Sequence, residues 1–255
     1  MPNKQNSTIQ LVVQATSGEG LGSQYERVQL ITLLPKIIEG LKIKAIFEVP
    51  AAITKGWDNV HFGEDKAITV SNEKDLSSIY PYQPKPSFIT PSQSDSKKYD
   101  LVWNFAVFHQ HPELFNTMMK YSKKYVLIFT PNVLNWGAPL HWGYHLFSKT
   151  KCHHPEKGNF NLMTLWGLKK YLKTNGLSIV RTGYFDAPYW PDFAFSKKEL
   201  AGSFPWLIKP QESKQVEDYQ AIFSKIKQAE AFEQRLPHWT LPLIAHHQYV
   251  LAQKI

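Results

Sequence analysis

Two side chains that can exchange protons follow predicted strands of this chain. His109 comes just after an apolar run at residues 100–107, and Asp186 comes just after a second run at residues 177–184. A histidine titrates near neutral pH, so it can take a proton from a bound nucleophile. We therefore predict His109 and Asp186 as catalytic residues that orient or deprotonate an acceptor. The alternative for His109 is a surface histidine beside the start of a helix.

Aromatic side chains gather in the segments around these two residues. Substrate pockets are mostly apolar with a few polar groups, and we predict Trp136, His141 and Trp190 as substrate-binding residues. Each aromatic ring has packing in the core or in a loop as its alternative. His141 and His145 are spaced to share one face of a helix, which would suit zinc. No helix is predicted there and no acidic residue lies between them, so we predict no metal site.

The elements that must position these residues include two strands and a helix in the middle of the chain. Residues 100–107 form an apolar run too short for an ordinary helix, and residues 125–129 form a second run. Between them, Pro112 and Glu113 mark the start of a helix, because proline in the first helical turn loses no hydrogen bond. Two buried strands joined by a helix predict a right-handed βαβ unit, with ligands beyond the carboxyl ends of its strands.

Further elements are predicted on both sides of this unit. Pro35 falls inside the helix predicted at residues 24–41 and should kink or split it, whereas Asn175-Gly176 should cap a helix at residues 161–174. The proline-rich residues 77–96 are predicted as a loop. The remaining predictions are strands at residues 42–49, 67–70, 87–90, 177–184 and 243–253, irregular chain at residues 187–210, and a polar helix at residues 213–234.

Several segments of the sequence resemble one family. The runs YDLVWNF at residues 99–105 and KYVLIFTPN at residues 124–132 resemble the fourth and fifth strands of class I S-adenosylmethionine-dependent methyltransferases. GEGLGSQYERVQL at residues 18–30 resembles their first helix, and YFDAPYWPD at residues 184–192 resembles the loop after the sheet. The resemblance implies an α/β Rossmann-like sheet with helices on both faces and aromatic and His-rich loops over the strand ends. It also implies S-adenosylmethionine as cofactor and methyl transfer to a small-molecule or polar acceptor.

The resemblance allows two registers for the methyl-donor site. In the first, the strand at residues 42–49 opens the sheet, and Glu48 matches the family's acidic residue at that strand end. The turn that follows keeps only Gly56, and Asn72 stands after the second strand, where the family usually carries an acid. In this register we predict that the methyl donor is bound by Glu48, Pro50, Ala51, Asn72, Asn104 and Phe105.

In the second register, residues 9–15 form the first strand, and three glycines between Gly18 and Gly22 form a phosphate-style turn. Glu48 then ends the second strand, but its spacing from Gly22 exceeds the roughly 20 residues of that fingerprint. This register also allows a NAD-type Rossmann enzyme. If the second register does not apply, the glycines form a loop before the first helix, and this loop could fold over a ligand. We therefore predict Gly20 and Tyr25 as further donor-binding residues.

The glycine-poor turn and the short segment between Asn72 and Tyr99 leave a second function open. The chain would then be a catalytically silent relative of methyltransferases that serves as a binding or scaffold subunit, because a fold alone does not fix a function. A protein partner or a homo-oligomer fits this alternative. The predicted organisation is an N-terminal segment with the first helix at residues 1–41, followed by a methyltransferase-like Rossmann domain at residues 42–255.

The composition excludes several classes of protein. With 255 residues and 43% hydrophobic residues, the chain can bury a large core and is not a disordered protein. The net charge of +8 permits an acidic acceptor or partner, but the lysines are too scattered to predict nucleic-acid binding. The single cysteine, Cys152, excludes an internal disulfide. There is no apolar run of about 18 residues and no signal region, so we predict a cytoplasmic protein that does not cross a membrane.

Overall fold

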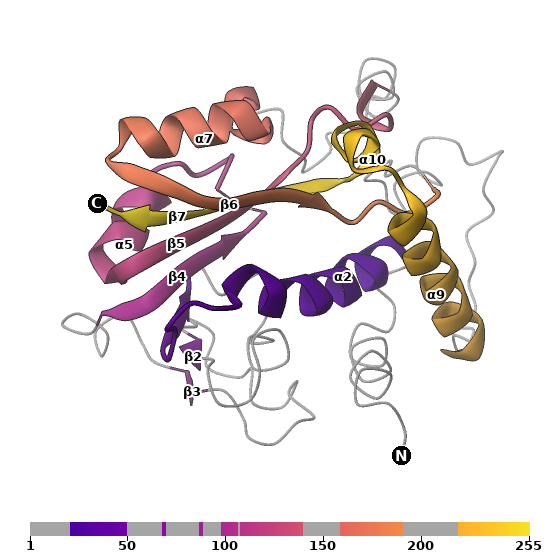
Figure 1. Ribbon diagram of the computed structural model, residues 1–255, viewed down its shortest axis with the longest axis horizontal. Helices are drawn as coiled ribbons and strands as arrows, with labels where there is room; N and C mark the ends of the chain where they lie inside the picture. The colour runs from indigo at the N-terminus through magenta and orange to yellow at the C-terminus, as the bar shows by residue number, and fades with distance from the viewer. Residues whose placement is uncertain are drawn as a thin grey trace, which may run out of the picture. The chain divides into compact units, whose positions relative to one another are not determined.

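The chain is described by a computed structural model for residues 21–49, 68–69, 87–88, 98–106, 108–139, 159–190 and 219–255 (Figure 1). It divides into two compact units. The first, Gln29–Asn132, Gly158–Phe185 and His247–Ile255, holds the main sheet, and we call it the sheet unit. The second, Met1–Val28, Val133–Lys157 and Asp186–His246, holds helix α9 (Tyr219–Arg235), and we call it the α9 unit.

The sheet unit is built on five strands in the order β1-β4-β5-β7-β6. β1, β4 and β5 are parallel, and β7 is antiparallel to both of its neighbours, β5 and β6. β6 therefore runs in the same direction as β5, and these four strands share one carboxyl end of the sheet. The strands are β1 (Ile46–Glu48), β4 (Tyr99–Phe105), β5 (Ser122–Pro131), β6 (Leu177–Phe185) and β7 (His247–Lys254), and β2 (Ile68–Thr69) and β3 (Ser87–Phe88) form a separate parallel pair.

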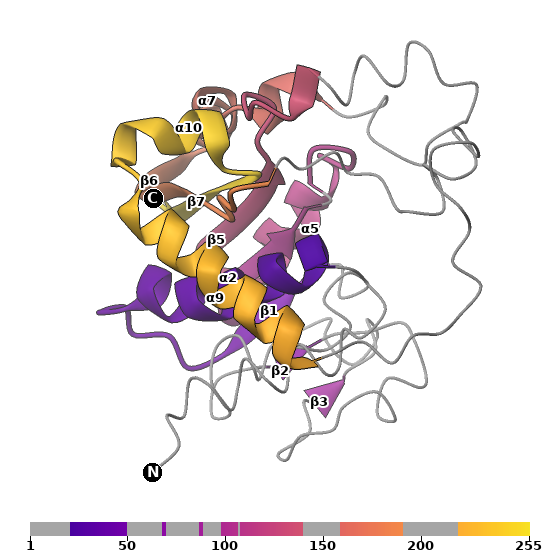
Figure 2. The same ribbon diagram turned by 90° about the vertical axis from the view of Figure 1, so that its right-hand side faces the viewer.

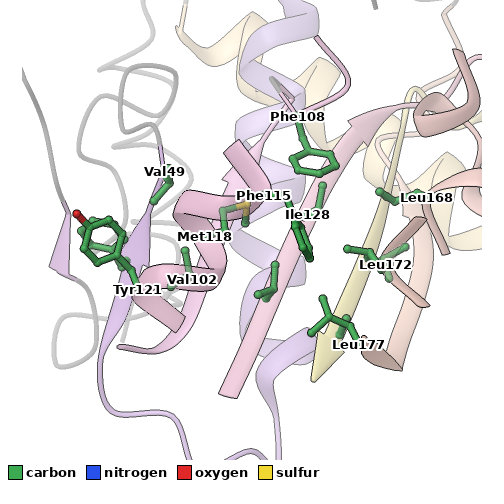
Figure 3. Close-up of a cluster of buried hydrophobic side chains, with 14 of the residues drawn as sticks. Val49, Val102, Phe108, Phe115, Met118, Tyr121, Ile128, Leu168, Leu172 and Leu177 are labelled. Carbon is green, nitrogen blue, oxygen red and sulfur yellow. The ribbon is translucent and has the colours of Figure 1, made fainter. Parts of the chain in front are cut away.

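One face of this sheet is covered by α5 (Leu114–Tyr121) and α7 (Leu165–Thr174). Figure 3 shows the buried side chains that join them to the strands. The helices contribute Phe115, Met118, Leu168 and Leu172, and the strands contribute Val102, Val126, Ile128, Val250 and Ala252. Apolar residues recur at helical spacing in α5 and α7, so each helix buries one stripe against the sheet.

The opposite face is covered by the part of α2 (Leu21–Ile38) that belongs to the sheet unit (Figure 1 and Figure 2). Successive residues of a strand point to opposite faces, so Leu101 and Trp103 of β4 lie on this face while Val102 lies on the other. The α2 residues that pack here are Leu30, Leu34, Ile37 and Ile38. Burial on both faces explains why β4 and β5 read as continuous apolar runs in the sequence.

Side-chain hydrogen bonds define the ends of two helices. The Thr164 hydroxyl oxygen accepts a hydrogen bond from the Gly167 amide at the start of α7, which is ordinary N-terminal capping. After α7, Gly176 has a φ of 79°, a conformation that glycine adopts at little cost, and it confirms the predicted Asn175-Gly176 cap. The guanidinium of Arg181, on β6, donates hydrogen bonds to three carbonyl oxygens at the end of α2, those of Lys36, Ile37 and Glu39.

Most of the predicted elements are present, with corrections at their ends. The βαβ unit is confirmed, because β4 and β5 are parallel and α5 joins them. Pro35 does not split α2, which continues to Ile38, since the packing of Leu34, Ile37 and Ile38 outweighs one lost hydrogen bond. The other corrections are that α2 begins at Leu21 rather than Gln24, β1 is confined to Ile46–Glu48, and η2 (Phe160–Met163) precedes α7.

The predicted last strand also begins later than expected. Residues Leu241–Ile244 form the short helix α10, with Pro242 in its first turn, and β7 begins only at His247. Another short helix, η3 (His238–Thr240), lies between α9 and α10. The predicted loop at residues 77–96 falls mostly outside the described residues, as does the strand predicted at residues 9–15.

The sheet, its strand directions and its two helical layers confirm the predicted α/β fold with a Rossmann-like sheet. Within the described ranges, no helix combines the length and the apolar character needed to cross a membrane.

Candidate functional site

The carboxyl ends of β1 and β4 are held together by the side chain of Asn104. Its amide nitrogen donates a hydrogen bond to the Val49 carbonyl, and its amide oxygen accepts one from the Phe108 backbone nitrogen, 3.0 Å away. Asn104 is fully buried, so the amide replaces backbone hydrogen bonds where the two strands end. Asn104 was predicted to bind the methyl donor, and its observed hydrogen bonds hold the ends of the two strands.

Two residues with left-handed backbones stand directly after parallel strands. Ala106, after β4, has a φ of 55°, and Asp186, after β6, has a φ of 63°. Within the described part of the chain they are the only residues other than glycine with positive φ. Such strain costs about 1–3 kcal/mol and tends to collect at functional sites. Its position therefore supports the carboxyl end of the sheet as the place where ligands bind.

His109 is buried close to this end of the sheet unit without a polar partner. It is 2% exposed, and neither ring nitrogen has a hydrogen-bond partner in the part of the chain that the structure describes. Burial, followed by the charges of His247 and His111, lowers the pKa of His109 to about 4. The side chain is therefore a neutral imidazole at pH 7, and a ligand could satisfy its two nitrogens.

Aromatic rings and an amide line the start of β7 in the same unit. The His247 ring lies 5.6 Å from the Phe105 ring and 5.4 Å from the Phe185 ring, measured between centroids. Beside it, the Gln248 amide donates a hydrogen bond of 3.1 Å to the Thr130 hydroxyl, near the end of β5. Phe105, predicted to bind the methyl donor, is therefore part of a buried cluster of flat rings.

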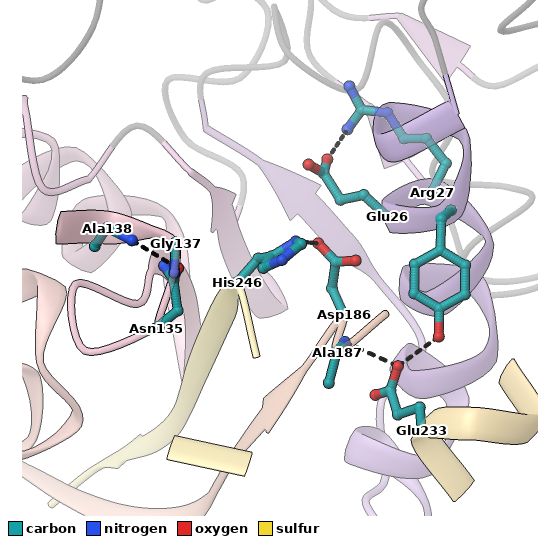
Figure 4. A network of polar contacts seen from close by, with 10 residues as sticks. Glu26, Arg27, Asn135, Gly137, Ala138, Asp186, Ala187, Glu233 and His246 are labelled. Atoms are coloured by element: carbon teal, nitrogen blue, oxygen red, sulfur yellow. Dashed lines mark hydrogen bonds and ion pairs between the residues drawn. The ribbon is translucent and has the colours of Figure 1, made fainter. Parts of the chain in front are cut away.

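In the α9 unit, Asp186 faces His246 (Figure 4). The distance from His246 Nδ1 to the Asp186 Oδ2 atom is 3.5 Å, and the His246 amide donates a hydrogen bond of 2.9 Å to the Asp186 carbonyl. Asp186 is 2% exposed and His246 is 5% exposed. This buried pairing of a carboxylate with an imidazole was not predicted, although each of the two residues stands next to a predicted strand.

A second carboxylate of the α9 unit fixes the chain next to Asp186. The Glu233 Oε2 atom accepts hydrogen bonds from the Tyr25 hydroxyl, at 2.6 Å, and from the Ala187 amide, at 3.0 Å (Figure 4). Burial raises the pKa of Glu233, although these two hydrogen bonds lower it. Burial also raises the pKa of Tyr25, and the charge of Glu233 raises it further, so Tyr25 remains a hydroxyl.

The predicted aromatic residues of the α9 unit have different environments. The Trp190 ring packs edge-to-face against Tyr25, 5.5 Å away, and against Tyr189, 4.8 Å away. Trp136 is 45% exposed, and its amide donates a hydrogen bond of 2.7 Å to the Leu243 carbonyl. The structure thus brings Trp190 and Tyr25 together, while no described contact joins Trp136 to them.

The predicted site residues fall into three groups. Asn104, Phe105 and His109 belong to the sheet unit, and Tyr25, Trp136, Asp186 and Trp190 belong to the α9 unit. Gly20, Pro50, Ala51, Asn72 and His141 lie outside the described residues, as does the side chain of Glu48. The sequence analysis assigned no role to Glu233 or to His246.

The two proposed registers of the methyl-donor site also have different outcomes. β1 lies beside β4 and parallel to it, with Glu48 opposite Trp103, as the first register requires. Gly22 lies in the first turn of α2, so the phosphate-style turn of the second register does not include it. The structure therefore favours the first register for the part of the site that it describes.

No protein-family model matches the sequence, and no curated protein matches it. Among solved structures, magnesium protoporphyrin IX methyltransferase from Synechocystis PCC 6803, with bound S-adenosylhomocysteine, shares 10% identity at a TM-score of 0.46 over 92% of this chain and 83% of that chain. A SAM-dependent methyltransferase from Archaeoglobus fulgidus shares 14% identity at a TM-score of 0.44, over 90% of this chain and 94% of that chain. A cyclopropane-fatty-acyl-phospholipid synthase-like protein from Lactobacillus casei ATCC 334 shares 9% identity at a TM-score of 0.49, over 98% of this chain and 99% of that chain. The fold assignment rests on the order and directions of the strands in the chain itself.

Proposed function

We propose that this chain is an S-adenosylmethionine-dependent methyltransferase acting on a small-molecule or polar acceptor. The observation that carries the proposal is the carboxyl end of the sheet, where β1 and β4 are parallel and tied by Asn104, with the unpartnered imidazole of His109 close by. Ligands of open α/β sheets bind beyond the carboxyl ends of the strands. A buried polar group without a protein partner is a further sign of a ligand at this position.

The residues of the sheet unit fit an adenosine-containing ligand. Phe105 offers a flat ring, and neutral His109 can donate one hydrogen bond and accept another. Together with Glu48, Pro50, Ala51 and Asn72 of the first register, they form our proposed donor site. The bound cofactor would supply a methyl group activated by a sulfonium, and the protein would orient it and keep water away.

We also propose roles for two further donor-binding residues, Tyr25 and Gly20, and for the residues that bind the methyl acceptor. The Tyr25 hydroxyl is engaged by Glu233, so Tyr25 would act through its ring, and Gly20 would act through its backbone. The proposed acceptor residues are Trp136, His141 and Trp190, with Asp186 as a group that serves the proton transfer. All of these, apart from His141 and Gly20, belong to the described part of the α9 unit.

Calorimetric titration of the purified full chain with S-adenosylmethionine and S-adenosylhomocysteine tests the proposal. We expect micromolar binding, a free energy of about −8 kcal/mol. The variants Asn72→Ala and His109→Gln should each weaken binding, because each removes a proposed contact. His111→Gln is the matched control, since His111 is exposed and bonds to Glu113. Absence of binding up to millimolar ligand would contradict the proposal and leave the scaffold alternative.

A further inference from the structure

Helix α7 of the sheet unit presents aromatic rings and lysines at its surface. Trp166 is 70% exposed, and Phe160, in η2 directly before α7, is 53% exposed. Lys170 and Lys173 are exposed and Lys169 is half-buried. We call these five residues the α7 surface, and we propose that it binds a phospholipid bilayer that contains anionic lipids. The inference is independent of the proposed methyl transfer.

The spacing along α7 separates this surface from the side that packs on the sheet. Trp166, Lys170 and Lys173 fall on one face of the helix, because residues three and four positions apart are neighbours. Leu168 and Leu172 are fully buried and pack on the strands from the other side of the helix (Figure 3). Figure 1 shows α7 on the outside of the sheet unit. Such a helix can lie on a bilayer without crossing it.

The positive charge of the α7 surface is not compensated nearby in the sequence. Among the described residues, none of its three lysines takes part in an ion pair. Residues 157–185, which include η2, α7 and β6, contain no Asp or Glu, and α5, the other helix on this face of the sheet, contains none either. Glu113, directly before α5, is bonded to His111. This charge is complementary to the phosphates of anionic lipid headgroups.

The aromatic rings of the α7 surface stand on a rigid support. A Cβ at Gly167 would overlap the Asn161 carbonyl, so glycine allows η2 to pack closely on the first turn of α7. The Thr164 hydroxyl donates a hydrogen bond to that carbonyl and accepts one from the Gly167 amide. The Lys170 ammonium lies 5.1 Å from the centre of the Trp166 ring. Because this support exists before binding, insertion of the rings costs little conformational entropy.

A bilayer explains this combination of side chains better than other anionic or apolar partners. Single-stranded nucleic acid also binds lysines and aromatic rings, but it does so in a groove that follows its backbone, whereas the α7 surface is the outward side of one helix. A second copy of the chain would bring like charges together. Tryptophan lies at headgroup level in bilayers, and the apolar stem of lysine extends along it towards the phosphates.

Flotation of the full chain with lipid vesicles tests the proposal. We expect binding to phosphatidylcholine vesicles that contain about 30% phosphatidylglycerol, and binding to pure phosphatidylcholine that is weaker by about tenfold or more. Loss of three lysines should weaken binding to the anionic vesicles by about 100-fold, which is about fivefold for each lysine. The triple variant for this measurement is Lys169→Gln, Lys170→Gln and Lys173→Gln.

A second triple variant provides the matched control, because it removes the same net charge elsewhere in the sheet unit. It combines Lys36→Gln, Lys42→Gln and Lys44→Gln, at three exposed positions. We expect its binding to stay within about threefold of the wild type, since charges farther from the bilayer are screened by salt. Equal losses for the two triple variants would overturn the proposal, and so would equal binding to vesicles with and without phosphatidylglycerol.

Tryptophan fluorescence tests whether the aromatic ring enters the bilayer. Trp166→Ala should weaken vesicle binding by about tenfold, the effect of leaving one large apolar side chain out of the interface. Trp239→Ala is the control, because Trp239 is 75% exposed on η3 of the α9 unit. Vesicles should shift the emission of the wild type to shorter wavelength, and the shift should be absent in Trp166→Phe. The same shift in this variant, or equal losses in the two alanine variants, would contradict insertion of Trp166.

Three further measurements separate the bilayer from other partners and from the proposed function. Single-stranded RNA of about 20 nucleotides should not displace the chain from anionic vesicles, and sedimentation velocity should give one species for wild type and Trp166→Ala. Displacement by RNA, or a dimer that Trp166→Ala dissociates, would overturn the proposal. The variants of the α7 surface should bind S-adenosylhomocysteine as the wild type does. A loss of vesicle binding with unchanged binding of this ligand therefore leaves the proposed function standing.

Discussion

The two buried histidines of this chain, His109 in the sheet unit and His246 in the α9 unit, have opposite surroundings. Both are at most 5% exposed. His109 has no polar partner among the described residues and a pKa lowered to about 4, whereas His246 faces the carboxylate of Asp186. Burial without a polar partner, together with the charges of His247 and His111, keeps the His109 imidazole neutral, whereas His246 is held beside a carboxylate. The comparison supports His109 as a ligand-binding group of the proposed function.

The largest expected effect concerns the framework next to His109. Asn104→Ala leaves the Val49 carbonyl and the Phe108 amide without partners in a buried region, which should cost about 4 kcal/mol of unfolding free energy. Chemical denaturation measures this loss. Asn116→Ala, at an exposed position of α5, should change the stability by less than about 0.5 kcal/mol. A loss below about 1 kcal/mol for Asn104→Ala would show that the amide is not holding the two strand ends.

The next effect is the pH dependence that His109 imposes on stability. Its pKa is about 4 in the folded chain and about 6.5 when unfolded, so between these values the unfolded state binds more protons. The stability that His109 contributes is therefore complete above pH 6.5 and is lost as the pH falls towards 4, by up to about 3 kcal/mol.

Denaturation of wild type and His109→Gln at several pH values measures this dependence. The variant should lose less stability than the wild type between pH 6.5 and 4, because glutamine does not titrate. Asn116→Ala, at an exposed position of α5 that does not titrate, is the control variant, and its pH dependence should match that of the wild type. Parallel curves for wild type and His109→Gln would mean that His109 is not buried as a neutral group.

A smaller effect is expected in the α9 unit, where polar groups have partners. Tyr25→Phe removes the hydrogen bond to Glu233 and should cost about 1.5 kcal/mol, a typical value for a bond to a charged group. It should also raise the pKa of Glu233 further, because that hydrogen bond lowers it. Tyr189→Phe, at a residue 47% exposed, is the control. A double-mutant cycle with Glu233→Gln should show coupling between Tyr25 and Glu233, and additive losses would refute the contact.

The smallest effect belongs to an ion pair within the helix α9. Lys227 and Glu230 form an ion pair of 2.7 Å on α9, but the lysine is 36% exposed on its side chain. Lys227→Ala should therefore cost only about 0.3 kcal/mol in thermal or chemical denaturation. A loss as large as that of Tyr25→Phe would mean that the Lys227–Glu230 ion pair stabilises α9 as strongly as the hydrogen bond between Tyr25 and the half-buried Glu233.

The fold was largely predictable because its signals are local. β4 and β5 are apolar runs too short for helices, and Pro112 with Glu113 marks the start of α5. The ends of elements were less predictable, because they depend on contacts distant in the sequence. Pro35 is an example, since the packing of α2 on the sheet decides that the helix continues past it.

The site was predictable only where residues adjoin strand ends. His109 and Asp186 were found because they follow apolar runs, and both occupy buried positions. The groups that fix the chain next to Asp186 were not predictable, because Tyr25 and Glu233 are 208 positions apart in the chain and neither belongs to a motif. The antiparallel direction of β7, which places His246 before its first residue, follows from the topology rather than from local sequence.

Hydrogen–deuterium exchange with and without saturating S-adenosylhomocysteine tests the central claim most directly, namely that the methyl donor binds at the carboxyl ends of β1 and β4. The account predicts slower exchange in peptides that cover the end of β1 and residues 103–109, with little change in α7. Protection confined to residues 9–25 would place the ligand at the glycine-rich segment of the second register. Either that result or an absence of any protection would contradict the account.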